Sequence, residues 1–292
     1  MDDAENHSGP AGLTADGNRV ALPLRWLLAP ALALAAMYGP ALIDLVSDWY
    51  QDANYSHGFL IGPVSAWLLW RRRGEFRNMT PKVDHRGLAL VLAALGLFVV
   101  ANAGAEYFTL RVSLVMLLAG LVWYLLGLSI LKKAWFEVAV LLFMIPLPYV
   151  IYYSATFPLQ LLASKITVTL LNLIGAGAVR EGNIIHLSGI SLAVAEACSG
   201  MRSLVSLMAL GAVYAHISQL SAGRKLLLFL AGVPIAVGAN VVRVFVTALL
   251  AYIGGAEVTA EPWHTLLGLS VFVMAFIGLS VTAVLLRGRS RV

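Results

Sequence analysis

Residues 226–252 read LLLFLAGVPIAVGANVVRVFVTALLAY and contain a single charged side chain, Arg243. A helix needs about 20 mainly apolar residues to cross the hydrocarbon core of a bilayer, and this stretch exceeds that length. Backbone inside lipid must satisfy its hydrogen bonds internally, and a helix does so. The stretch therefore predicts a helix that spans a membrane.

Similar apolar runs recur along the rest of the chain. We place further spans at about 26–46, 55–70, 87–105, 112–131, 134–151, 201–217 and 265–286. The chain is 60% hydrophobic and 12% charged, whereas a soluble domain has about 25% charged residues. We expect an all-α polytopic membrane protein of about eight transmembrane helices. These helices form one domain at 21–292, after a disordered polar tail at 1–20.

The positions of the basic residues predict the orientation of the chain. Alternate loops hold 15 of the 20 Lys and Arg residues, and basic loops face the cytoplasm. Both termini are therefore expected inside a bacterial inner membrane. The net charge of +5 is no sign of nucleic-acid binding, because it resides in these loops. The basic set is Arg19, Arg25, Arg71, Arg72, Arg73, Arg77, Lys82, Arg86, Lys132, Lys133, Arg224, Lys225, Arg287, Arg289 and Arg291.

Two segments in the second half do not read as ordinary spans. Residues 158–174 are long enough to cross but carry several polar side chains, so we expect a helix lying in the interface. If this helix did cross, every later basic loop would face outward. Residues 179–197 hold apolar residues split by Ser188-Gly189, a turn dipeptide, which predicts a β-hairpin on the outer face. Strand edges are not tolerated in lipid, so the hairpin must pack on protein or sit in the interface.

The single cysteine, Cys198, lies in EACSGMRS at 196–203, where the predicted hairpin meets a helix. Ser199 is a plausible N-cap for that helix. The helix dipole and Arg202, one turn on, both favour the thiolate and lower a thiol pKa. This arrangement suits a nucleophile, and the alternative is a small cysteine packed between helices. With one cysteine, no intramolecular disulfide is possible.

Arg243 lies inside the opening stretch, in NVVR at 240–243. Asn240 and Arg243 are three residues apart and share a helix face. An arginine inside a membrane costs at least about 2.5–3.5 kcal/mol on insertion scales, which indicates a partner or a function. The alternative is a snorkelling or structural arginine that pairs with an acid such as Glu196.

Histidines supply candidates for acid–base chemistry on the predicted outer side. His264 precedes the last helix, and an imidazole can act as the base or acid for a thiol. Its alternative is an interfacial histidine beside Trp263 in the aromatic belt. His57 and His186 are competitors on the same side. No histidine pair has metal-ligand spacing, so neither a metal nor another cofactor is expected.

These motifs in this order resemble the exosortase/archaeosortase family, as does YSHGFLIGPVSAWLLW at 55–70. The resemblance implies a catalytic set of Cys198, Arg243 and His264. Glu196, Arg202, Asn240 and His57 are then expected to bind substrate or support the site. It also implies partners that carry a C-terminal PEP-CTERM signal, a Pro-Glu-Pro motif followed by a membrane helix and a basic tail, and a link to exopolysaccharide production.

We expect Cys198 to attack a backbone carbonyl near the outer face and to form a thioester. The acyl group of this thioester then passes to water or to another acceptor. Water would make the protein a protease, and another acceptor would make it a transpeptidase. The main alternative is a transporter or a non-enzymatic scaffold of polysaccharide assembly. A protease that cuts within the bilayer is a third reading, against which the outer position of Cys198 argues.

Overall fold

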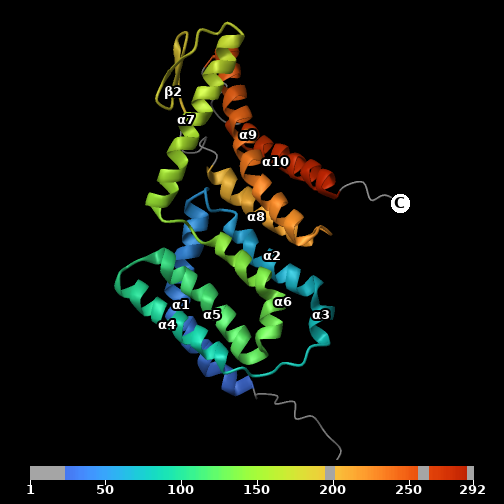
Figure 1. Ribbon diagram of the computed structural model, residues 1–292. Coiled ribbons are helices and arrows are strands. Elements are labelled where there is room, and N and C mark those ends of the chain that lie inside the picture. Colours follow the sequence, from blue (N-terminus) through green and yellow to red (C-terminus); the bar gives the residue numbers. More distant parts are fainter. Residues whose placement is uncertain (1–23, 195–200, 256–262, 288–292) are drawn as a thin grey trace, which may run out of the picture. The chain divides into compact units, whose positions relative to one another are not determined.

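The computed structural model describes residues 24–194, 201–255 and 263–287 (Figure 1). The chain divides into two compact units, Met1–Pro40 and Ala41–Val292. Helix α1, Leu24–Gln51, begins in the first unit and ends in the second. The second unit contains all the other helices and strands, and it holds every contact discussed below.

Helices α2 to α5 follow α1 and include the first closely packed pair. Their bounds are Gly58–Arg71 for α2, Arg73–Arg77 for α3, Arg86–Ala103 for α4 and Tyr107–Leu126 for α5. Helices α4 and α5 approach closely at glycines: a Cβ at Gly120 would lie 2.9 Å from the backbone nitrogen of Val91. Small residues are the usual means by which membrane helices approach each other. The Glu106 carboxylate caps α5 by accepting hydrogen bonds from the backbone N–H groups of Phe108 and Thr109.

The chain breaks where the sequence predicts continuous helix. Helix α6, Leu128–Ala139, starts after Gly127 at φ +95°, a conformation that favours glycine. A 3₁₀ turn, η1, follows at Val140–Met144, and α7 runs over Tyr149–Leu173. The predicted spans 112–131 and 134–151 therefore have wrong bounds. Pro146 and Pro148 explain the second break, because proline has no N–H to donate and restricts the residue before it.

The same break changes the interpretation of residues 158–174. They are the later part of α7, which begins nine residues earlier and contains Pro158 in its interior. The segments Leu128–Met144 and Tyr149–Leu173 are bent by 82° relative to each other, as in a broken span or a re-entrant loop. The predicted interfacial helix is therefore not a separate element, because its residues form the later part of α7, the second member of this bent pair.

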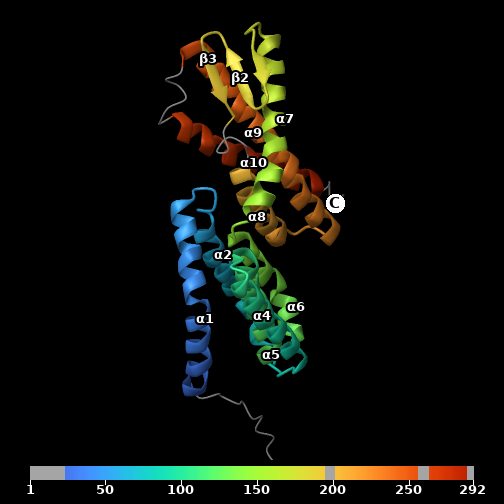
Figure 2. The ribbon, with the colours of Figure 1, turned by 90° about the vertical axis from the view of Figure 1, so that its left-hand side faces the viewer.

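A small antiparallel sheet follows α7. Its strands are β1 at Val179–Glu181, β2 at Ile184–Leu187 and β3 at Ile190–Ala193. Leu187 pairs with Ile190, so Ser188-Gly189 forms the turn between β2 and β3, and β1 adds a third strand beside β2 (Figure 2). The inner side chains Ile185 and Leu187 pack on α7 and α9, so the sheet rests on protein.

The last three helices form one packed group, with α9 between α8 and α10. Their bounds are Met201–Ile217 for α8, Ala222–Gly254 for α9 and Trp263–Arg287 for α10. Helix α9 contacts α7, α8 and α10 (Figure 1). Leu207 of α8, Ala236 of α9 and Val271 of α10 are buried together in one core cluster. Helix α9 is longer at both ends than the predicted 226–252.

Four helices in the described part of the chain are long and apolar enough to cross a membrane: α4, α5, α9 and the Leu266–Arg287 part of α10. The bent pair raises this number to five. The protein is therefore a polytopic, mainly helical membrane protein, but the predicted number of eight spans is not confirmed. Helix α2, with 14 residues, is about 21 Å long at 1.5 Å per residue, short of the ~30 Å hydrocarbon core.

Candidate functional site

Arg243 lies between two helices. It is 5% exposed, and Asn240, one turn earlier on α9, is 3% exposed. A Cβ at Gly268 of α10 would lie 3.8 Å from Nη2 of Arg243, so the guanidinium lies alongside the second turn of α10. A snorkelling arginine would extend to the interface, whereas this one is enclosed by protein. A charge this deeply buried carries a desolvation cost that its surroundings must offset.

Helix α10 brings His264 to the same region of the fold. His264 precedes Gly268 by four residues, and positions i and i+4 share a helix face. The backbone of His264 therefore lies one turn before the point where Arg243 meets α10. The side chain of His264 lies outside the described part of the structure. Arg243 and His264 are far apart in sequence, and it is the packing of α9 on α10 that relates them.

The predicted nucleophile and its neighbours precede α8. Cys198 and Glu196 lie outside the described residues, and Arg202 is described only as part of the first turn of α8. Packing contacts of Leu204 and Val205 show which elements surround the start of α8. Leu204 packs into the core shared with α9 and α10, and it also packs, with Val205, against Tyr55 and Tyr152.

His57 stands at the start of the second helix, as the sequence predicts. It immediately precedes α2, and its Nε2 lies 3.0 Å from the carbonyl oxygen of Phe143 in the 3₁₀ turn. The neighbouring carbonyl of Met144 accepts a hydrogen bond from Nε1 of Trp49 at 2.8 Å. His57 therefore anchors the broken stretch between α6 and α7. Within the described residues, no contact joins it to Arg243.

His186, the other competitor, belongs to the sheet. Its Nδ1 lies 2.8 Å from Oγ of Ser191 on β3, and its Nε2 lies 3.4 Å from a carboxylate oxygen of Glu181 on β1. These contacts connect all three strands. Both contacts hold the imidazole within the sheet, which favours a structural role for His186.

A cavity of about 600 Å³ opens between the ends of α1, α5 and the loop before α7. Asp44, Asp48 and Glu106 line it, and Asp48 forms a 2.7 Å ion pair with the buried guanidinium of Arg111. A smaller cavity of about 250 Å³ shares Asp48 and the Pro146–Leu147 loop residues with the first. It is also lined by the same two tyrosines, Tyr55 and Tyr152, that pack near the start of α8.

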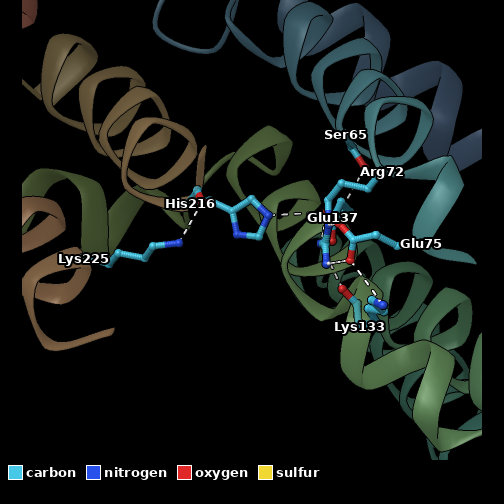
Figure 3. A network of polar contacts seen from close by, with 7 residues as sticks. All are labelled: Ser65, Arg72, Glu75, Lys133, Glu137, His216 and Lys225. Atoms are coloured by element: carbon cyan, nitrogen blue, oxygen red, sulfur yellow. Dashed lines mark hydrogen bonds and ion pairs between the residues drawn. The ribbon is translucent and has the colours of Figure 1, made fainter. Parts of the chain in front are cut away.

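Figure 3 shows a second polar cluster around Glu137. The side chain of Glu137 is completely buried. Its Oε1 lies 2.6 Å from Nη1 of Arg72 and 3.4 Å from Nε2 of His216. The backbone carbonyl of Glu137 accepts a 2.6 Å hydrogen bond from Ser65. Arg72 also pairs with Glu75 at 3.2 Å. The cluster therefore ties α6 to the end of α2 and to the end of α8.

Sequence reasoning missed both Glu137 and the Asp48–Arg111 pair. The available signal was the position of each charge inside an apolar run. Among the described residues, no group of three His, Cys, Asp or Glu side chains is arranged to hold a metal ion.

The fold and the buried Arg243 define a polytopic membrane protein with a polar centre between its last two helices. A family model described as transmembrane exosortase matches residues 49–281. The match covers well over half of the chain, so the protein belongs to the transmembrane exosortase family, as the sequence motifs indicated. Neither the curated proteins nor the solved structures include a match to it.

Proposed function

We propose that this exosortase is a membrane-embedded cysteine transpeptidase or protease that cleaves C-terminal sorting signals of the PEP-CTERM type. Its active site faces the periplasm near the outer surface of the inner membrane. Cys198, Arg243 and His264 carry the reaction, and Glu196, Arg202 and Asn240 support them. The observation that carries the proposal is the burial of Arg243 against α10, one helical turn from His264.

The reaction follows from the chemistry of these three side chains. The Cys198 thiolate attacks a backbone carbonyl carbon, and the carbonyl oxygen becomes an oxyanion that Arg243 stabilises. One such donor in a dry site is worth about 10²–10³ in rate. The C–N bond then breaks, and His264 gives a proton to the leaving amine. Water or a second nucleophile, deprotonated by His264, attacks the resulting thioester and releases the thiolate.

The two cavities, which share Asp48, Pro146 and Leu147 in their linings, support a path for the substrate. They hold acidic and tyrosine side chains, among them Asp48 and Tyr55, and they lie beside residues that pack near the start of α8. An extended polypeptide with exposed N–H groups would find acceptors there. The polypeptide that precedes the substrate's membrane helix is the segment that would enter.

The decisive experiment is to trap the thioester. A membrane protein with a C-terminal sorting signal is co-expressed with the wild-type chain, and hydroxylamine-sensitive adducts are sought by mass spectrometry. An adduct on the peptide that contains Cys198 is expected. Cys198→Ala should accumulate in the membrane and process nothing, while Lys82→Gln, at an exposed loop residue, serves as the control. Normal processing by Cys198→Ala would favour the transporter or scaffold reading instead.

A further inference from the structure

A groove of about 420 Å³ runs between α6 and η1 on one side and α8 and α9 on the other. Of its twelve lining residues, ten are apolar, including Phe136, Phe143 and Phe229. The two others are His216 and Lys225. The groove is separate from Arg243 and from the acidic cavities. The groove therefore presents a mainly apolar surface, and we call the part lined by His216 and Lys225 its basic end.

The basic end is held in a defined position. The ring of His216 stacks on Phe136 with centroids 3.9 Å apart and planes 3° apart. Nζ of Lys225 donates a 3.0 Å hydrogen bond to the backbone carbonyl of His216, which uses one of its three donors. None of the ion pairs in the described part of the chain involves Lys225, and the buried Glu137 carboxylate pairs with Arg72.

The groove opens at the surface of the protein. Trp135 and Leu226, on its rim, are 59% and 57% exposed. A narrow, flexible hydrocarbon chain fits both its volume and its aromatic walls.

We propose that this groove binds an anionic phospholipid, with one acyl chain between the phenylalanines and the phosphate at Lys225. Arg224 lies beside Lys225 in the first turn of α9, where the helix dipole also favours an anion. Basic pockets between membrane helices attract anionic headgroups for this reason. A zwitterionic lipid brings no net charge to neutralise the lysine. The proposal is independent of the cysteine chemistry proposed above.

Native mass spectrometry of the full-length protein, released from micelles doped with phosphatidylglycerol or phosphatidylcholine, tests the preference. The wild type should retain phosphatidylglycerol more strongly. Lys225→Gln should retain it about fivefold less, since a basic residue near the surface contributes about 1 kcal/mol. Lys82→Gln removes the same charge from an exposed loop residue and should change nothing. Equal retention of both lipids by the wild type, or unchanged retention by Lys225→Gln, overturns the proposal.

A second measurement uses the unaltered protein. A phosphatidylglycerol analogue with a photoreactive acyl chain is crosslinked in vesicles, and the labelled peptides are identified. Label is expected on peptides that contain Phe143 and Phe229. Label confined to other helices, such as α4, contradicts the proposal. Crosslinking of the groove to a second protein copy or to a co-expressed substrate in place of lipid would also overturn it.

Discussion

At the scale of single residues, the burial of Arg243 calls for a planar guanidinium that lysine does not reproduce. Arg243→Lys should leave an inserted protein whose processing, normalised to membrane-inserted protein, falls about 10²-fold. Arg202→Lys, in the first turn of α8, should lower the protein level more than the normalised rate. The measurement is processing per inserted molecule for both variants. If Arg243→Lys stayed active while Arg202→Lys lost activity, the two roles would be exchanged.

Gly268 offers a second test of the same contact. A Cβ there would meet Arg243 at 3.8 Å, an ordinary van der Waals distance, so Gly268→Ala should process normally. Gly268→Leu adds atoms where the guanidinium lies and should reduce normalised processing at least about tenfold, since a misplaced catalytic group loses much of its rate. Gly238→Leu is the control, because Gly238 on α9 faces open space. Equal activity of the Ala and Leu variants at 268 would remove Arg243 from the site.

At the scale of elements, the Glu137 cluster joins α2, α6 and α8 through one buried carboxylate. Glu137→Gln leaves the Arg72 guanidinium without its buried counter-charge, which costs of the order of 3 kcal/mol of unfolding free energy. Glu75→Gln removes an exposed partner of the same arginine and should lower the unfolding free energy much less. Denaturant unfolding in mixed micelles measures both. Similar losses for the two variants would show that the network contributes no more than a surface ion pair.

At the scale of the whole molecule, the bent pair of α6 and α7 decides the topology. Reporter fusions after Arg73 and Lys133 should read cytoplasmic, and one after Gly182 should read periplasmic. Between the first two points lie α4 and α5, two crossings. Lys133 is in the first half of α6, so most of the bent pair, one crossing, lies between the last two points. The short helices α2 and α8 must then cross as well, with α1, to place both termini inside. A cytoplasmic reading at Gly182 would turn the pair into a re-entrant loop and contradict the site model.

The sequence by itself determined the membrane character and the turn at Ser188-Gly189, and it singled out Arg243 as a charge inside an apolar run. These features follow from local physics: apolar length, turn chemistry and the cost of a charge in lipid. Hydropathy also placed most of α4, α8 and α10 correctly, because their faces toward lipid and toward protein are both apolar.

Only the tertiary structure decided how sharply the chain bends between α6 and α7 and which polar groups meet. Hydropathy treats 134–151 as one run, whereas Pro146 and Pro148 separate η1 from α7. The Glu137–Arg72 pair joins residues 65 positions apart, and Gly268 meets an arginine from another helix. Such contacts depend on how helices pack, and side chains that are adjacent in space leave no periodic trace in the chain. The roles of Cys198 and His264 remain the prediction made from their motifs.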